Sequence, residues 1–322
     1  MFINPTAKQG IVVWRQYGDA SKSAMVFLNG ISGLPAGAEL QRYLPDDVPI
    51  ISIQAPDLTR NFSVKDITER AIYYLKTLIF ELDGRSQSVH LVGYSGGGPL
   101  AFEIALQAKT STLECKSLCL IDPTPYPFSA TSLTFSLGDY LKQRAEKYDM
   151  FSRFLLGKHT GFEQAVSSNE VRSVGQLEQH VLSAMSSESL ALELSCIVDT
   201  AMKQTSELMN RDLAPHRKYT GPCAFLKADP DFYVKAGIDA DHIHHPDGVY
   251  GWSLPLSCPD IKAIPLACGH LSIFKDGEAV GKVASTILSL LNMENIEEAQ
   301  SSDPEPHVAE QVNILPKIIT KD

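Results

Sequence analysis

The stretch His90–Gly98, which reads HLVGYSGGG, decides the fold of this chain. It places the pattern G-x-S-x-G, centred on Ser95, directly after the apolar run Val89–Val92 and directly before the helix-like segment Pro99–Gln107. A serine between a strand and a helix is the context of a nucleophile elbow, in which a strained turn presents the hydroxyl at the N-terminus of the helix. Glycines two positions before and two positions after the serine let neighbouring backbone approach closely. We therefore predict that Ser95 is a catalytic nucleophile. The alternative is a glycine-rich turn without chemistry.

Short apolar runs and helical patterns alternate on both sides of this stretch. Several runs are continuously apolar, which is typical of a parallel sheet covered on both faces. The predicted strands are Ile11–Trp14, Met25–Leu28, Pro49–Gln54, Val89–Val92, Ser117–Ile121, Cys223–Leu226 and Ile261–Pro265, and the first two are expected to be adjacent strands. The predicted helices are Ala38–Leu44, Val64–Leu82, Pro99–Gln107 and Ala279–Leu291. The pattern predicts an α/β fold with a mostly parallel sheet covered by helices.

One segment, Thr131–Tyr219, interrupts this alternation. It contains helical patterns at Leu133–Phe154 and Leu177–Met209 and no convincing strand. An insertion between two strands would lie above their C-terminal ends, where ligands bind in open α/β folds, so we predict a helical lid. Its apolar side chains, such as Phe151 and Phe162, fit either an acyl tunnel or packing between helices.

The length and composition predict one large folded domain. The chain has 322 residues, of which 44% are hydrophobic and 20% are charged, as in ordinary globular proteins. We assign residues 1–294 to this domain, with the lid at about 131–219. Residues 295–322 have few core-like positions before residue 314, and we predict a mobile C-terminal tail there.

Charge and cysteine content exclude several classes of function. The net charge of -10 opposes binding to phosphate backbones, so nucleic acid is not an expected partner. The six cysteines have no C-x-x-C spacing, which predicts neither a metal site nor a disulfide framework. No run approaches the roughly 18 apolar residues of a membrane span, and no basic and apolar leader opens the chain. We expect a cytoplasmic protein with reduced thiols and no membrane span.

A serine nucleophile needs a base and an acid, which follow it in the order serine, acid, histidine. His270 lies in the segment Pro265–Leu271, which we expect to be a loop between the last strand and the last helix. Two acids are possible: Asp122 follows one strand and Asp229 follows the next. The remaining histidine cluster, His242, His244 and His245, has no accompanying acid or cysteine spacing and is predicted to be surface loop rather than a metal site.

An oxyanion hole needs two backbone N–H groups, one from the residue after the nucleophile and one from a loop after an earlier strand. Gly96 provides the first. The loop Asn29–Gly33 follows the strand Met25–Leu28 and provides the second, with Ile31 preferred and Gly30 next. A plain glycine-rich turn is the alternative for this loop.

The residues resemble the thioesterase domains of non-ribosomal peptide and polyketide synthases, a family that includes the thioesterases of animal fatty acid synthases. The resemblance covers roughly Ile11–Leu291. The segments on which it rests are Gly93–Gly98, Gln54–Pro56, Leu120–Asp122, Gly251–Trp252 and Gly269–His270. It implies an α/β-hydrolase fold with a helical lid after the acid, and it favours Asp122 over Asp229. The sequence departs from the family at Asn29–Gly30, where relatives often have His-Pro or Pro-Pro, and in its tail after Asn295.

The resemblance implies a thioesterase that releases an acyl, peptidyl or polyketide chain through an acyl-enzyme on Ser95, by hydrolysis or macrocyclisation. Its partners would be an acyl or peptidyl carrier protein, whose phosphopantetheine arm carries the acyl thioester substrate, and it would need no cofactor of its own. The enzyme alternatives are a standalone editing (type II) thioesterase, although those more often show His-Ser-Met-Gly around the nucleophile, and a general carboxylesterase. The non-enzyme alternative is a hydrolase-like binding protein, which the ordered set Ser95, Asp122 and His270 disfavours.

Overall fold

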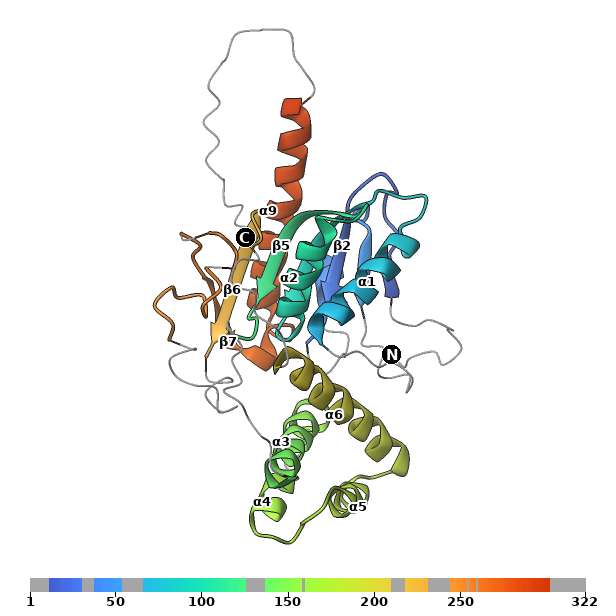
Figure 1. Cartoon of the computed structure of the whole chain (residues 1–322), viewed down its shortest axis with the longest axis vertical. Helices are drawn as coiled ribbons and strands as arrows, with labels where there is room; N and C mark the ends of the chain where they lie inside the picture. Colours follow the sequence, from blue (N-terminus) through green and yellow to red (C-terminus); the bar gives the residue numbers. More distant parts are fainter. Residues whose placement is uncertain are drawn as a thin grey trace, which may run out of the picture.

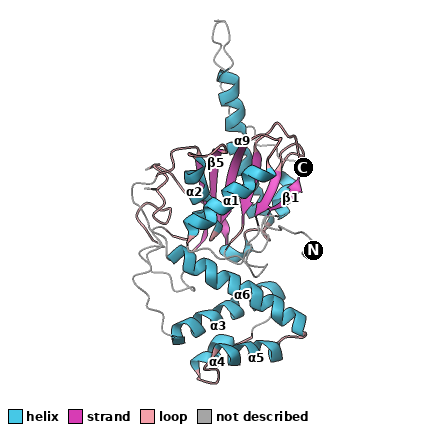
Figure 2. Cartoon of the chain, turned by 45° about the vertical axis from the view of Figure 1, so that its right-hand side comes forward, coloured by secondary structure: helices cyan, strands magenta, loops and turns pink. Residues whose placement is uncertain are grey.

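A seven-stranded sheet forms the centre of the protein (Figures 1 and 2). The computed structural model describes residues 12–30, 38–53, 66–125, 137–157, 160–209, 218–230, 244–253, 255–258 and 260–301. The strands lie in the order β1-β3-β2-β4-β5-β6-β7, and every pairing is parallel except that of β1 with β3. Their bounds are Val12–Gln16 (β1), Ala24–Leu28 (β2), Ile50–Ile53 (β3), Ser88–Tyr94 (β4), Glu114–Ile121 (β5), Cys223–Asp229 (β6) and Ile264–Gly269 (β7). The predicted fold class is confirmed.

The first two strands are not neighbours, so the expectation that they are adjacent is wrong. β1 pairs with β3, where Val12 lies opposite Ile53. Contacts distant in sequence support this pairing: the Gln16 side chain donates hydrogen bonds to the carbonyls of Pro45 and Val48, just before β3. A short turn alone therefore does not determine which strands pair.

The last strand begins three residues later than predicted, at Ile264 instead of Ile261, and extends to Gly269. Pro265 lies inside it, because β7 is at the edge of the sheet, where a missing N–H is tolerated. His270 consequently follows the strand directly, in a short 3-10 turn, and does not lie in a longer loop. This brings His270 to the C-terminal edge of the sheet.

Helices cover both faces of the sheet. On one face α1 (Ile67–Glu81) and α2 (Gly97–Ala108) enclose an apolar cluster centred on β2, β4 and β5. On the other face a 3-10 helix, η1 (Ala38–Tyr43), and α9 (Gly277–Ser301) enclose a second cluster. α9 continues past the predicted domain boundary at residue 294, and residues 302–322 of the predicted tail lie outside the described residues.

Four helices occupy the interval in which the sequence predicts a helical lid. They are α3 (Leu137–Leu156), α4 (Phe162–Ser167), α5 (Val174–Ala184) and α6 (Glu188–Met209). They have a core of their own, in which Phe151 and Phe162 are buried, so these two side chains pack between helices. The single helical pattern predicted over Leu177–Met209 is two helices, because Met185 is extended and Ser187 accepts a hydrogen bond that starts α6.

The four-helix unit lies beyond the ends to which the arrows of β5 and β6 point in Figure 1. It is therefore placed at the C-terminal edge of the parallel strands, which is the ligand-binding edge in this class of fold. Within the described segments, no helix combines the length and the apolar character needed to cross a membrane.

Candidate active site

Ser95 occupies the sharp turn between β4 and α2. Its backbone is left-handed, with φ +55°, a region that residues other than glycine seldom adopt. Hydrogen bonds hold this conformation: Ser95 N donates to the carbonyl of Ile121 at 3.0 Å, and Gly98 N donates to the carbonyl of Ser95 at 2.9 Å. The elbow is thus fixed both to β5 and to the first turn of α2.

Two glycines of the elbow are required by close backbone packing. A Cβ at Gly93 would lie 2.5 Å from the carbonyl oxygen of Gly97, and a Cβ at Gly97 would lie 2.3 Å from the carbonyl oxygen of Leu28. Neither backbone oxygen can rotate away as a side chain would. Gly93 therefore lets the first turn of α2 pack against the end of β4, and Gly97 lets that turn pack against the end of β2.

Ser95, His270 and Asp122 form a continuous hydrogen-bonded chain. Nε2 of His270 lies 2.9 Å from Oγ of Ser95, and Nδ1 of His270 lies 2.6 Å from Oδ2 of Asp122. A carboxylate can only accept, so Nδ1 carries the proton and Nε2 is free to accept the proton of Ser95. This is the arrangement of nucleophile, base and orienting acid that serine hydrolases use.

The two candidate acids lie in different environments. Asp122 directly follows β5, is 0% exposed and has a left-handed φ of +40°. Its second oxygen, Oδ1, accepts hydrogen bonds from the amide of Ala228 at 3.0 Å and from the hydroxyl of Tyr250 at 3.3 Å. Asp229 is exposed at the end of β6. The carboxylate that contacts His270 is that of Asp122.

The backbone around Ser95 contains donors suited to an oxyanion. Gly96 is buried and is the N-cap of α2, and the first N–H groups of a helix have no partner within it. Gly30 also lies close to Ser95, since a Cβ at Gly30 would be 3.3 Å from the Cβ of Ser95. Ile31, the preferred second donor, lies outside the described residues. The roles of Gly96, Gly30 and Ile31 stay predictions.

The side chain of Asn29 anchors the start of the oxyanion loop. Its amide donates to the carbonyl of Ile53 at 2.6 Å and to Oγ of Ser52 at 3.2 Å, both on β3. Asn29 belongs to the pair Asn29–Gly30, one of the two departures from the family pattern noted in the sequence. Here it holds the end of β2 against the neighbouring strand.

Tyr94 is a contact of His270 that the sequence analysis missed. Its hydroxyl donates to the backbone carbonyl of His270 at 2.9 Å, and the two rings stack with centroids 5.0 Å apart. Burial raises the pKa of the Tyr94 phenol, so the hydroxyl keeps its proton and remains a donor. Its position beside Ser95 was the available signal, but the pairing with His270 depends on β7.

The described members of the histidine cluster and the cysteines take no part in the hydrogen-bonded chain Ser95–His270–Asp122. His244 is exposed, His245 contacts Asp247 at 2.9 Å, and His242 lies outside the described residues. The six cysteines are free thiols. In the segments that the structure describes, no three His, Cys, Asp or Glu residues are grouped so that they could hold a metal ion.

Comparison with known families agrees with the resemblance found in the sequence. The family model described as "Thioesterase domain" matches residues 38–155, a range that includes Ser95 and Asp122. This match confirms the resemblance and supports a hydrolase. No curated protein matches the chain.

Solved structures similar to this one confirm the fold. The NocB thioesterase domain, in covalent complex with a fluorophosphonate nocardicin G analog, is 19% identical with a TM-score of 0.53, covering 87% of this chain and 99% of its own. The type II thioesterase BorB of the borrelidin biosynthetic cluster is 16% identical with a TM-score of 0.57, covering 87% of this chain. The match to BorB covers 97% of the BorB chain.

A larger protein contains a similar unit. AB3403, a four-domain nonribosomal peptide synthetase, is 19% identical over 88% of this chain, with a TM-score of 0.68. This chain spans 20% of the length of that synthetase. The α/β-hydrolase fold of this protein is that of the thioesterases NocB and BorB.

Proposed function

We propose that this protein is a thioesterase that releases an acyl, peptidyl or polyketide chain from the phosphopantetheine arm of a carrier protein. The observation that carries this proposal is the buried chain Ser95–His270–Asp122, with contacts of 2.9 Å and 2.6 Å. The match of residues 38–155 to the thioesterase family model supports thioesters as the substrate class.

The reaction begins at Ser95. Nε2 of His270 takes the proton of the hydroxyl while Oγ attacks the thioester carbon, which forms a tetrahedral intermediate. The C–S bond then breaks, and the pantetheine thiolate leaves with the proton from His270. Water, or a nucleophile of the substrate itself, gives its proton to His270 and attacks the acyl-enzyme. The C–O bond to Ser95 breaks, and the serine regains its proton.

Three further groups assist these steps. The amide of Gly96 and a second amide from Ile31 or Gly30 donate to the oxyanion, an effect of about 3 kcal/mol per donor in comparable sites. Asp122 keeps the proton on Nδ1 of His270 and stabilises the imidazolium that forms during the reaction. All groups needed for acyl transfer are side chains or backbone amides, so the proposal includes no cofactor.

The partner in this proposal is an acyl or peptidyl carrier protein, and the compartment is the cytoplasm. The four helices α3 to α6 lie at the same edge of the sheet as Ser95, which supports their role as a lid over a carrier-bound chain (Figure 1). The six free thiols fit a reducing compartment.

The proposal is tested with an acyl-pantetheine thioester and a fluorophosphonate probe. We expect the native protein to turn over the thioester and to be labelled once, and Ser95→Ala to do neither. Ser183→Ala is the matched control, because Ser183 is exposed in α5, where its hydroxyl donates only to a backbone carbonyl of its own helix. Turnover by Ser95→Ala would contradict the proposal.

The identity of the leaving group separates the proposal from its alternatives. A thioesterase is expected to prefer the carrier-bound thioester over an oxygen ester of the same acyl group, whereas a general carboxylesterase would not. Faster release of short, misloaded acyl groups than of full chains would identify a type II editing enzyme. Labelling of Ser95 without turnover of any ester would indicate a binding protein.

A further inference from the structure

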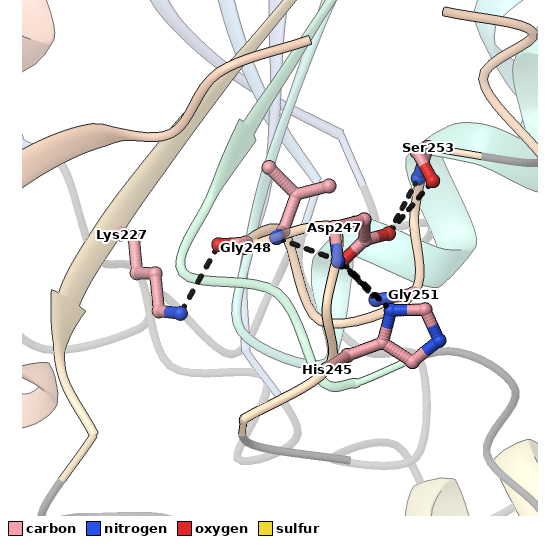
Figure 3. Close-up of polar contacts among 7 residues, drawn as sticks. Lys227, His245, Asp247, Gly248, Gly251 and Ser253 are labelled. Atoms are coloured by element: carbon pink, nitrogen blue, oxygen red, sulfur yellow. Dashed lines mark hydrogen bonds and ion pairs between the residues drawn. The ribbon is translucent and has the colours of Figure 1, made fainter. Parts of the chain in front are cut away.

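A tight turn between β6 and β7, which we call the Asp247 turn (Asp247–Ser253), is organised around one carboxylate (Figure 3). The carboxylate of Asp247 accepts hydrogen bonds from the amides of Val249, Gly251 and Ser253 at 2.9, 3.1 and 3.2 Å, and from the Ser253 hydroxyl at 2.8 Å. Burial alone would raise the pKa of Asp247, but these hydrogen bonds outweigh it and lower the pKa to about 2. The turn is thus held by an ionised side chain.

This turn forces Tyr250 into an unusual conformation. Tyr250 has φ +56° and Gly251 has φ +83°, so two successive residues are left-handed. A left-handed conformation costs a residue other than glycine about 1 kcal/mol or more, which the bonds to Asp247 offset. As a result the Tyr250 side chain is directed into the protein and is 0% exposed.

Lys227 of β6 holds the same turn from the other side. Its ammonium group donates to the carbonyl of Gly248 at 3.1 Å (Figure 3). It also lies 4.2 Å from the centroid of the Tyr250 ring, within the range of a cation–π contact. The ring of Tyr250 is therefore fixed by its own backbone and by a neighbouring strand.

The hydroxyl of Tyr250 reaches the acid of the catalytic chain. It donates to Oδ1 of Asp122 at 3.3 Å, and the amide of Ala228 donates to the same oxygen at 3.0 Å. The other oxygen, Oδ2, is the one that contacts His270 at 2.6 Å. Donors on Oδ1 set the rotation of the carboxylate, and this rotation determines the direction in which Oδ2 points.

A second contact links the Asp247 turn to the same region. The indole N–H of Trp252 donates to the backbone carbonyl of Thr124 at 2.9 Å, two residues beyond Asp122. Thr124 N in turn approaches the carbonyl of Ser95 at 3.4 Å. The turn therefore contacts both the side chain of the acid and the backbone that follows it.

We propose that Tyr250, held by the Asp247 turn, is a positioning residue that orients Asp122 toward His270. This inference rests on the proposed function, because it assigns a role in the chemistry of Ser95. Tyr250 is fully buried and acts through Asp122, without touching the substrate. Removal of its hydroxyl should lower kcat and leave KM unchanged.

The test compares Tyr250→Phe with Tyr219→Phe in the full-length chain. Tyr219 is a matched control, because it is also a buried tyrosine but its hydroxyl contacts Cys115 and the carbonyl of Pro222. We expect kcat for an acyl-pantetheine thioester to fall about tenfold in Tyr250→Phe, since a hydrogen bond to a charged group is worth roughly this much. Tyr219→Phe should keep the native kcat.

A spectroscopic measurement separates positioning from a general loss of stability. The proton between Nδ1 of His270 and Asp122 gives a far-downfield resonance in the proton NMR spectrum. We expect this resonance to shift or broaden in Tyr250→Phe and to stay unchanged in Tyr219→Phe. An unchanged resonance and an unchanged kcat in folded Tyr250→Phe would overturn the inference, as would an equal loss in both variants.

A double-mutant cycle tests whether the Asp247 turn acts through Tyr250. Asp247→Asn should lower kcat in the native background and have a much smaller effect in the Tyr250→Phe background, because coupled residues are not additive. Additive effects would exclude this coupling. Failure of the proposed function looks different: turnover would then persist in Ser95→Ala, whatever the result at Tyr250.

Discussion

Replacement of Gly97 by alanine tests how the sheet and α2 build the elbow. The added Cβ would lie 2.3 Å from the carbonyl oxygen of Leu28 and 2.5 Å from that of Asn29, whereas real Cβ atoms essentially never approach closer than 3.0 Å. Both obstacles are backbone atoms, so α2 and the end of β2 must separate by about 0.7 Å to bring the shorter contact to 3.0 Å.

The magnitude of the effect follows from that displacement. Overpacking of a tightly packed interior costs roughly 1–3 kcal/mol and more where backbone must move, so we expect Gly97→Ala to lose about 3 kcal/mol of unfolding free energy. Ser95 lies two residues before Gly97 and must move with it. A misplacement approaching 1 Å lowers activity by roughly 100-fold, which is the expected loss in kcat.

The matched control is Gly281→Ala in α9. A Cβ at Gly281 meets nothing within 4 Å and the residue lies inside a helix, so alanine should raise the free energy of unfolding by about 0.5–1 kcal/mol. Denaturant unfolding and thioester turnover measure both variants. Native stability and turnover in Gly97→Ala would refute the reasoning about the elbow.

Three further predictions concern the acid, the Asp247 turn and the helical unit. Asp122→Asn should lower kcat by about 10³–10⁴-fold, because His270 loses the acceptor that fixes its tautomer. Asp229→Asn should keep most of the activity. A larger loss of kcat in Asp229→Asn than in Asp122→Asn would make Asp229 the acid. The pKa of Asp247 in the folded protein is lowered to about 2 from an ordinary 3.8. The native protein should therefore have a higher free energy of unfolding than Asp247→Asn, and this difference should be fully present above pH 4 and decrease as the pH falls toward 2. Urea unfolding across this range checks it, and a pH-independent difference would contradict it. Finally, the hydroxyl of Thr200 in α6 is buried with no hydrogen-bond partner among the described residues. Thr200→Val should therefore raise the unfolding free energy by roughly 1 kcal/mol. A lower melting temperature in Thr200→Val than in the native protein would refute this.

The elbow was predictable from the sequence because its requirements are local. A buried strand, a serine and glycines at fixed offsets are all contained within His90–Gly98, and the close backbone contacts of Gly93 and Gly97, which leave no room for a Cβ, show why the pattern is strict. His270 was also recognisable, because chain order placed it after the last strand. Its exact position was not predictable, because Pro265 made it hard to recognise that β7 continues to Gly269. A proline inside a strand is tolerated here because β7 is at the edge of the sheet.

The contacts that the sequence did not reveal join residues far apart in the chain. Asp122 directly follows β5 and Asp229 ends β6, and these strands run parallel to each other, so their positions in the chain alone left two acids possible. Tyr250 is 128 residues from Asp122, and its hydroxyl arrives there because Asp247 folds the turn between β6 and β7. Side-chain direction within such a turn depends on hydrogen bonds to a carboxylate, which periodicity and composition do not encode.

Backbone strain connects the residues that carry the proposed chemistry. Ser95, Asp122 and Tyr250 are all left-handed residues other than glycine, a conformation that persists only where the surroundings over-determine it. Each is held differently: the amide of Ser95 by a carbonyl of β5, the amide of Asp122 by a carbonyl of β6, and Tyr250 through its two neighbours, whose amides donate to the carboxylate of Asp247. The hydroxyl of Tyr250 donates to Asp122, Asp122 contacts His270, and His270 contacts Ser95. These separate backbone constraints therefore act on one continuous series of hydrogen bonds. The geometry of the proposed catalytic chain is therefore set by the backbone at three different connections of the sheet.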